Sequence, residues 1–230
     1  MTRFKLVLVV ALLIGFVPLA HAGFDEGKAA YDRGDYATAY KEFKSLADRG
    51  NADAQFALGK MYFYGQGVPQ DYAQAVNWFR KAADQGDAHA QNGLGAMYEL
   101  GKGVPEDYAE AVKWYRKAAD QGDAPAQYVL GSMYENAQGV PKDYPEAMKW
   151  YRLSADQGYP LAQYSLGIMY YTGEGVPKDY VQALMWFNVA AAQGYFEAQK
   201  GIDLVAEKMT PSQIAEAERL AREWKPKGGD

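Results

Sequence analysis

The sequence predicts an all-α solenoid, an array of antiparallel helix pairs stacked on one another. A block ending in Gly-Val-Pro-x-Asp-Tyr occurs four times at a constant step of 36 residues, and one tryptophan follows each copy at the same step. The aspartates of the four blocks are Asp71, Asp107, Asp143 and Asp179, and the tryptophans that follow them are Trp78, Trp114, Trp150 and Trp186. A constant period of this size is typical of stacked units, each too small to bury its own apolar face.

The chain begins with a predicted secretory signal peptide over residues 1–22. Arg3 and Lys5 precede an apolar run of 12 residues, and a small-x-small cleavage site ends at Ala22. The run is too short for a membrane anchor, which needs about 20 apolar residues, and no cysteine follows it to carry a lipid. We therefore expect cleavage after Ala22, export of the rest of the chain and no stable membrane insertion afterwards.

The composition excludes several classes of function. The net charge is −5, and removal of Arg3 and Lys5 with the signal makes the remainder more acidic. Because no basic stripe offsets this charge, nucleic acid and anionic membrane surfaces are poor partners. The chain has no cysteine, and its histidines are His21, which leaves with the signal, and His89. We expect no disulfide, no metal site and no cofactor.

Each repeat is predicted to contain two amphipathic helices, which we name helix A and helix B. In the copy over residues 51–86, apolar side chains recur at i, i+4, i+7 and i+8 in helix A and at i, i+3, i+4 and i+7 in helix B. These residues are Ala54, Leu58, Met61 and Tyr62 for helix A and Ala75, Trp78, Phe79 and Ala82 for helix B. Both patterns are one-sided helical stripes, so the two helices are expected to bury these faces.

Polar residues and glycines mark the ends of helix B. Asp71 precedes the helix and Gln74 follows three residues later, which is the pattern of a capping box, where each side chain bonds the other residue's backbone amide. The same pair recurs as Asp107 and Glu110, Asp143 and Glu146, and Asp179 and Gln182. Each helix B then ends at a Gln-Gly pair, whose glycine supplies the left-handed residue that closes a helix.

A glycine stands inside each helix A, at Gly59, Gly95, Gly131 and Gly167. A glycine in mid-helix costs about 1 kcal/mol relative to alanine. Its recurrence in one column therefore needs a packing reason. We expect helix B to approach closely there, with the tryptophan ring over the missing side chain.

Together, Leu-Gly-x-Met-Tyr, Gly-x-Gly-Val-Pro-x-Asp-Tyr, Ala-x-x-Trp and Ala-x-x-Gln-Gly-x-Ala-x-Ala-Gln resemble Sel1-like repeats, relatives of the tetratricopeptide repeat. The resemblance runs from about Asn51 to Gln199 and gives repeats over 51–86, 87–122, 123–158 and 159–194. It implies a right-handed superhelix of antiparallel helix pairs that binds or scaffolds other proteins. With the signal peptide it also favours the bacterial periplasm, with secretion to the outside as the alternative.

Both ends of the array depart from the repeat pattern. Residues 23–50 lack the tryptophan and resemble a tetratricopeptide hairpin. Residues 195–225 are expected to form a degenerate repeat and a capping helix that opens at Thr210, followed by a tail over 226–230. Within the array, Ala137 stands where the other copies have glycine, so the third loop is expected to differ in conformation or to be strained.

The helix A positions that vary between repeats share one face, distinct from the apolar stripe, because they fall at i, i+4 and i+7. We predict that the partner-binding residues are Phe56, Lys60, Phe63, Asn92, Glu99, Tyr128, Ser132, Glu135, Tyr164, Ile168 and Tyr171. By resemblance to tetratricopeptide repeats this is the concave surface. The alternative is that several of the aromatic residues pack against neighbouring helices. His89, in the first turn of a helix A, is predicted to be an ordinary surface histidine.

The predicted function is non-enzymatic binding of a protein or peptide in the cell envelope, by a chain expected to be a monomer. The aspartates recur at helix caps, which explains them without catalysis. A disulfide-rich branch of the Sel1-like family is linked to penicillin binding and β-lactamase activity. This chain lacks both cysteine and an S-x-x-K motif, so that alternative is the least favoured. The other alternative is a periplasmic regulator that holds a membrane sensor or an envelope-assembly complex in one state.

Overall fold

The structure, a computed structural model, describes residues 17–227, with the backbone alone for residues 17–22. The predicted signal peptide therefore lies outside the described residues, except for the backbone of 17–22, which forms the start of helix α2. All regular elements in the described part are helices. The chain divides into two compact units, one ending at Glu106 and the other beginning at Asp107, and each is described by itself.

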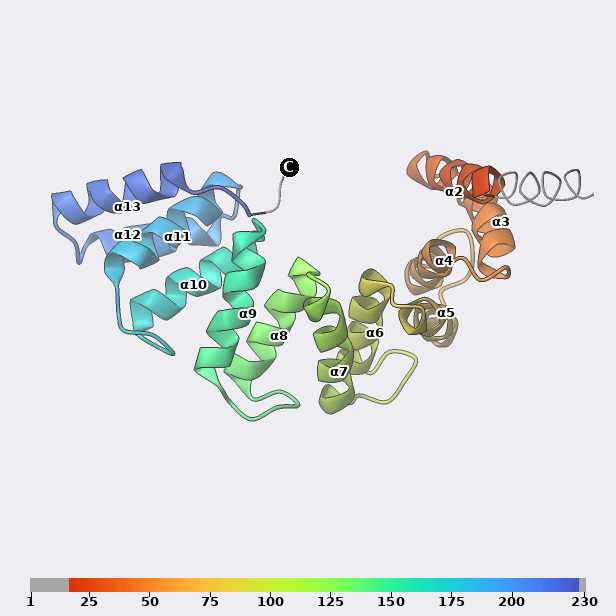
Figure 1. Cartoon of the computed structure of the whole chain (residues 1–230), viewed down its shortest axis with the longest axis horizontal. Coiled ribbons are helices and arrows are strands. Elements are labelled where there is room, and N and C mark those ends of the chain that lie inside the picture. The colour runs from red at the N-terminus through yellow and green to blue at the C-terminus, as the bar shows by residue number, and fades with distance from the viewer. Residues whose placement is uncertain (1–16, 228–230) are drawn as a thin grey trace, which may run out of the picture. The chain divides into compact units, whose positions relative to one another are not determined.

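Unit 1 is a series of helix pairs in which each helix packs against the next one in sequence (Figure 1). Its helices are α2 (Val17–Asp32), α3 (Tyr36–Ala47), α4 (Ala52–Tyr64), α5 (Tyr72–Asp84) and α6 (Ala88–Leu100). The core between them gathers the apolar stripes predicted from the sequence, including Leu58, Met61 and Trp78.

Unit 2 continues the same alternation and ends in two additional helices (Figure 1). Its helices are α7 (Tyr108–Asp120), α8 (Ala124–Asn136), α9 (Tyr144–Asp156), α10 (Pro160–Thr172), α11 (Tyr180–Ala192), α12 (Glu197–Ala206) and α13 (Pro211–Glu223). Both α12 and α13 pack on α11, and the core includes Leu166, Trp186 and Val205. The predicted all-α array of repeated helix pairs is confirmed.

Of the two hydrogen bonds predicted at the start of each helix B, the structure has the one to the aspartate side chain and lacks the return bond. Asp71 accepts a hydrogen bond from the Gln74 amide at 3.0 Å, and the aspartates of the other three repeats do the same. The predicted return bond is wrong, because the Asp71 amide already donates to the Tyr62 carbonyl at 3.0 Å. The Gln or Glu three residues after the cap therefore does not bond the cap amide. In the third repeat this residue, Glu146, accepts instead from the Trp150 indole Nε1 at 2.9 Å. A complete capping box occurs where α13 opens, between Thr210 and Gln213, as predicted.

The glycines inside the A helices make room for an aromatic ring, but the ring is not the tryptophan. A Cβ at Gly59 would lie 2.5 Å from Phe79 Cε1, and one at Gly167 would lie 2.5 Å from Phe187 Cδ1. Each ring belongs to the residue that follows the tryptophan in helix B. The prediction of close helix approach is confirmed, and its assignment to the tryptophan ring is wrong.

Buried glutamines join successive repeats, a role that the sequence analysis did not identify. Gln163 is fully buried, its Nε2 donates to the Ala155 carbonyl at 3.3 Å, and its Oε1 accepts from Gln193 Nε2 at 2.6 Å. Gln55 and Gln127 make the equivalent two bonds in their repeats. Because a buried amide without partners costs free energy, the column is strongly constrained.

Ala137 keeps the backbone conformation of the glycines that it replaces, and this gives a prediction. Its φ and ψ are 56° and 37°, close to the 69° and 35° of Gly65, so the loop is strained rather than rearranged. A left-handed conformation costs an L-residue roughly 1–2 kcal/mol. Glycine would relieve this strain, but its greater freedom in the unfolded chain offsets part of the gain. Ala137→Gly should raise the free energy of unfolding by about 0.5–1 kcal/mol in urea denaturation. A decrease would contradict the strain assignment, and the control Ala96→Gly, inside α6, should destabilise by about 1 kcal/mol.

A candidate protein-binding face on the A helices

The predicted partner-binding residues all lie on α4, α6, α8 and α10, and we call the surface that they form within each unit the helix A face. Every one of them is partly exposed, neither buried in the core nor fully open to solvent. Unit 1 carries Phe56, Lys60, Phe63, Asn92 and Glu99, and unit 2 carries Tyr128, Ser132, Glu135, Tyr164, Ile168 and Tyr171. Such positions have enough packing to be rigid and enough exposure to be touched by a partner.

In unit 1, Phe56 and Lys60 meet at a small cavity. The Phe56 ring lies 5.7 Å from the Phe79 ring and 5.9 Å from that of His89. The Lys60 ammonium lies over two rings, 5.8 Å from Phe56 and 5.7 Å from Tyr31. The cavity measures about 250 Å³ and is lined by Phe24, Lys28, Tyr31, Asp32, Phe43, Asp53, Phe56, Ala57, Lys60, Asp87 and His89. The sequence analysis did not assign Phe24, Tyr31 and Phe43, which come from the preceding hairpin.

Phe63 belongs to a different cluster. Its ring lies 5.4 Å from that of Tyr72, and the Lys102 ammonium lies 5.2 Å from Phe63 and 5.1 Å from Tyr72. Tyr171 repeats this arrangement in unit 2, where its ring lies 5.8 Å from that of Tyr180. For these two residues the structure supports packing against the following helix as their main role.

In unit 2, tyrosine rings gather around the A helices. Tyr128 lies 5.7 Å from Tyr151 and 5.5 Å from Tyr159, measured between ring centroids. Tyr164 lies 5.1 Å from Tyr195 and 5.4 Å from Phe187. We call Tyr128, Tyr151, Tyr159, Tyr164 and Tyr195 the tyrosine cluster. Tyr151 is its buried floor and the other four are partly exposed.

Glu135 meets the tyrosine cluster at its floor. The Tyr151 hydroxyl donates to Glu135 Oε2 at 2.5 Å. This bond explains a pairing visible in the sequence, where glutamate stands in helix A whenever tyrosine follows the tryptophan in helix B. Glu99 and Tyr115 stand at the equivalent sequence positions, whereas repeats with Phe79 or Phe187 carry an aromatic residue in place of the glutamate.

Tyr159 and Tyr195 occupy positions where the earlier repeats carry a helix cap. Asp87 and Asp123 each accept a backbone amide at the start of their A helices. Tyr159 makes no such side-chain bond. Loss of an N-cap typically costs about 1 kcal/mol, so this exchange trades helix stability for an aromatic surface. The break in the aspartate column was a signal that the sequence analysis did not use.

The electrostatic neighbours of the tyrosine cluster are acidic. Burial, followed by the hydroxyls of Tyr195 and Tyr159 and the Glu135 carboxylate, raises the pKa of Tyr128. Burial and then Asp123 raise the pKa of Tyr159. For Tyr195, burial and then Glu197 raise the pKa. The protonated phenols are thus favoured, and their ionised phenolate forms are disfavoured.

Raised tyrosine pKa values predict a loss of stability in alkali. An unfolded tyrosine loses its proton at about pH 10, whereas burial and the Tyr40 hydroxyl raise the pKa of Tyr62 to about 12. The stability contribution is therefore complete below about pH 10 and is lost as the pH rises through the folded value. Urea unfolding should give a level free energy up to about pH 9 and a fall between about pH 10 and about pH 12. No fall over that interval would contradict the raised values.

The remaining predicted residues contribute in less specific ways. Ile168 packs against the edge of the unit 2 core, and the Ser132 hydroxyl accepts a bond from Asn136 at 3.2 Å. Asn92 lies partly exposed on α6. Glu99 has electrostatic or hydrogen-bonded partners of its own.

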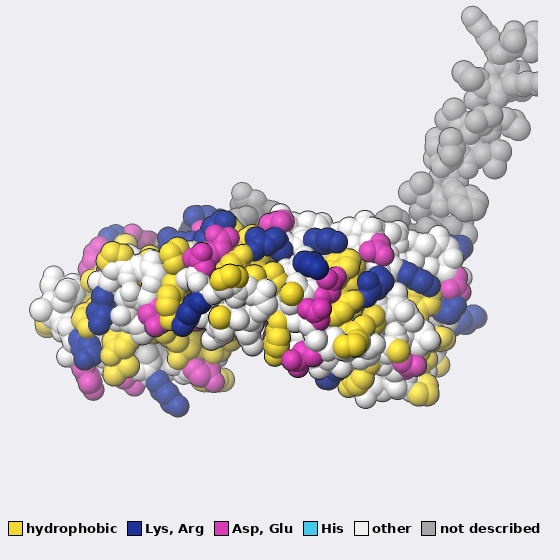
Figure 2. All heavy atoms as spheres, turned by 90° about the horizontal axis from the view of Figure 1, so that it is seen from below, with side chains coloured by type: hydrophobic (Ala, Val, Ile, Leu, Met, Phe, Trp, Pro, Cys, Tyr) yellow, Lys and Arg dark blue, Asp and Glu magenta, His cyan; other side chains and the backbone are white. Residues whose placement is uncertain are grey.

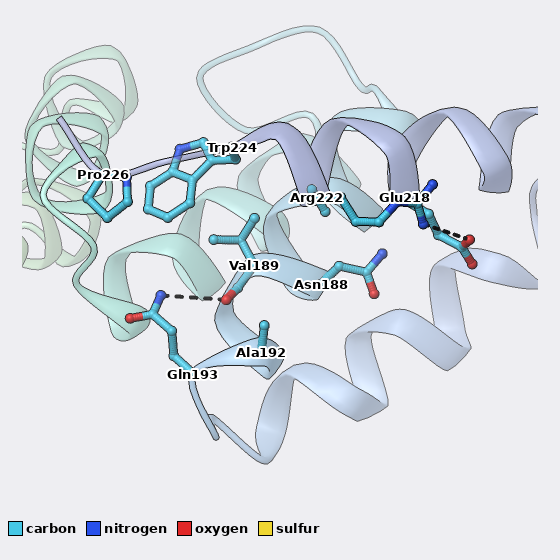
Figure 3. A pocket seen from close by; sticks show the side chains of 9 residues that line it. Asn188, Val189, Ala192, Gln193, Glu218, Arg222, Trp224 and Pro226 are labelled. Atoms are coloured by element: carbon cyan, nitrogen blue, oxygen red, sulfur yellow. Dashed lines mark hydrogen bonds and ion pairs between the residues drawn. The ribbon is translucent and has the colours of Figure 1, made fainter.

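A larger hollow of about 600 Å³ lies away from this face, between α11 and α13. Figure 3 shows Trp224 and Pro226 at one end and the Arg222–Glu218 ion pair, 3.7 Å long, at the other. Gln193 donates to the Val189 carbonyl at 3.5 Å. Arg222, Glu218 and Gln193 thus each bond to another residue of the lining.

Residues 17–227 meet neither the requirements of a metal site nor those of a membrane span. No group of three histidine, aspartate or glutamate side chains in this part is placed to hold a metal ion. None of its helices combines the length and apolar character that crossing a bilayer requires. On the face shown in Figure 2, basic and acidic side chains alternate with apolar ones, and neither sign forms a continuous patch.

Repeated helix pairs, a constant step and a face of varying partly exposed residues define a helical-repeat interaction protein. The Sel1 repeat model matches residues 52–87, 88–123, 124–159 and 160–195. The chain therefore belongs to the Sel1-repeat family, whose members are generally protein-interaction scaffolds.

Solved structures support the family assignment. A protective antigen of uropathogenic Escherichia coli with an SLR fold has a TM-score of 0.81 and 36% identity, over 89% of this chain and 45% of that one. A Sel1 repeat protein from Oxalobacter formigenes has a TM-score of 0.76 and 33% identity, over 87% and 82%. An immunity protein from Pseudomonas aeruginosa has a TM-score of 0.55 and 26% identity, over 90% and 80%. The chain thus spans less than half of the Escherichia coli protein, and none of the curated proteins compared with it matches.

Proposed function

We propose that this Sel1-repeat protein binds a partner protein or peptide through the helix A face, without catalysis, in the bacterial periplasm. The observation that carries the proposal is the tyrosine cluster of unit 2. Four partly exposed tyrosines gather there, and two of them, Tyr159 and Tyr195, stand where the earlier repeats have a capping aspartate. Partly buried aromatic residues that are already ordered by packing are typical of interface hot spots.

The proposal is tested by affinity capture from the native cell envelope with a variant of the face. Tyr128→Ala and Tyr164→Ala combined should weaken binding of the captured partner by at least roughly tenfold. A matched control is Lys113→Ala with Lys149→Ala, two exposed residues of helix B. If circular dichroism shows an intact fold and the double variant binds as well as the control, the helix A face is not the binding surface.

A periplasmic regulator of a membrane sensor or an envelope-assembly complex is the second candidate. The likeness to the Pseudomonas aeruginosa immunity protein favours it, because immunity is a function exerted against another molecule. Such a regulator uses the same face. Deletion of the protein should then change the activity of the captured partner, whereas a passive scaffold changes only its location.

Export and the absence of catalysis each have a direct test. N-terminal sequencing of the protein from the periplasmic fraction should begin at Gly23. Purified protein should not hydrolyse nitrocefin. Turnover that a substitution in this chain abolishes would contradict the non-enzymatic assignment.

A further inference from the structure

Cations lie over aromatic rings at many places in this chain. Lys81 lies 3.9 Å from the Trp78 centroid and Lys142 lies 4.5 Å from that of Tyr144. Tryptophans of unit 2 are covered in the same way, with Lys117 over Trp114, Arg116 over Trp150 and Arg152 over Trp186. Within the described residues, no lysine or arginine covers any ring of the tyrosine cluster. These rings therefore present uncovered electron-rich faces.

The charges next to these rings are also of one sign. Asp123, Glu135 and Glu197 each act electrostatically on a hydroxyl of the cluster. Glu135 holds the Tyr151 hydroxyl through Oε2 and forms no ion pair with the described residues. Lys142 acts on Glu135 at longer range, but its ammonium lies over the Tyr144 ring. Among residues 17–227, no cation lies over these rings and none forms an ion pair with Glu135.

We propose that the tyrosine cluster and Glu135 bind an arginine side chain of the partner protein. This proposal rests on the proposed function and makes it more specific. A guanidinium stacks on ring faces with its flat surface and donates hydrogen bonds to a carboxylate with its edge. Glu135 supplies Oε1, which Tyr151 leaves free, and Tyr128 and Tyr164 supply partly exposed rings. A lysine ammonium is a point charge and does not match the rings and carboxylate together.

The Tyr151 bond alone explains why Glu135 is present, but it does not explain the rest of the site. A buried phenol needs one acceptor, and one carboxylate oxygen provides it. It accounts neither for the lack of a cation over these rings nor for Tyr159 and Tyr195, which stand where the earlier repeats have Asp87 and Asp123. Glu135→Gln separates the two roles, because the amide oxygen still accepts from Tyr151 while the negative charge is lost.

The test uses three acetylated and amidated pentapeptides, Gly-Ser-Xaa-Ser-Gly, in which Xaa is arginine, lysine or citrulline. Binding to the full chain is measured by NMR titration of the tyrosine ring signals. The arginine peptide should shift the signals of Tyr128 and Tyr164 and bind roughly tenfold more tightly than the neutral citrulline peptide. Glu135→Gln should weaken binding of the arginine peptide about tenfold.

The matched control is Glu174→Gln. Glu174 also accepts from a tyrosine hydroxyl, that of Tyr144 at 2.9 Å, but this ring already carries Lys142. Glu174→Gln should leave binding of the arginine peptide unchanged. Equal binding of arginine and citrulline, equal binding of arginine and lysine, or an unchanged affinity in Glu135→Gln overturns the inference. If the partner is still captured through the helix A face in that case, the proposed function stands and the arginine assignment alone falls.

Discussion

Replacing Trp114 by alanine should lower the free energy of unfolding by roughly 3–5 kcal/mol. The ring is 6% exposed, so it is buried in the fold. Its Nε1 donates to Glu110 Oε1 at 3.1 Å, and the Lys117 ammonium lies 3.8 Å from the ring centroid. The substitution thus removes buried apolar area, leaves a cavity, and releases both an indole partner and a cation–π contact.

The measurement is equilibrium urea unfolding followed by circular dichroism. Because repeat arrays lose stability through neighbouring interfaces, amide hydrogen exchange should show the loss first in α7 and α8. Lys113→Ala is the control on the same helix, since its side chain is exposed, and it should change stability by no more than about 0.5 kcal/mol. A loss below about 1 kcal/mol for Trp114→Ala would show that the ring does not hold the repeats together.

Gly59→Ala should destabilise the protein, although alanine is the better helix former. The added methyl would lie 2.5 Å from Phe79 Cε1, so the ring or the helix must move. Overpacking of this kind costs about 1–3 kcal/mol, and the gain in helix propensity of about 1 kcal/mol offsets only part of it. The expected net loss in urea unfolding is on the order of 1–2 kcal/mol.

Gly93→Ala is the matched control because it faces the same ring from α6. Its added methyl would lie 3.5 Å from Phe79 Cε2, an ordinary contact distance. Gly93→Ala should therefore stabilise by up to about 1 kcal/mol, through helix propensity. Equal effects of Gly59→Ala and Gly93→Ala would show that the glycine column is not explained by the ring.

The repeat step and the cap residues predict the helices well, because helix starts and ends depend mainly on residues close by in the sequence. Asp71 lies before α5 as expected, and Thr210 before α13 completes its capping box. Side chains whose partners lie in other repeats were harder to assign. The second half of the Asp71 box fails because the Tyr62 carbonyl, nine residues earlier, takes the cap amide. The ring over Gly59 depends on how helix B rotates, which periodicity determines only approximately.

On the candidate face, too, the positions set by spacing within one repeat were predicted, and the contacts with other repeats were not. Spacing places Phe56, Tyr128 and Tyr164 on one side of the A helices, and the structure finds them partly exposed there. Spacing within one repeat cannot show that Tyr159 and Tyr195 join them, since these residues come from the starts of the following A helices. Nor does it separate Phe63 and Tyr171, whose rings pack on Tyr72 and Tyr180.

The most direct test of the central claim, that the helix A face binds a partner protein, is site-specific photo-crosslinking in living cells. A photoreactive amino acid replaces Ser132 on the face of α8, or Lys149 on the exposed side of α9 as the control. The account predicts a specific crosslinked protein from position 132 and none from position 149, with the adduct lost on combining Tyr128→Ala and Tyr164→Ala. Crosslinks from position 149 alone, or equal crosslinks from both, would contradict it.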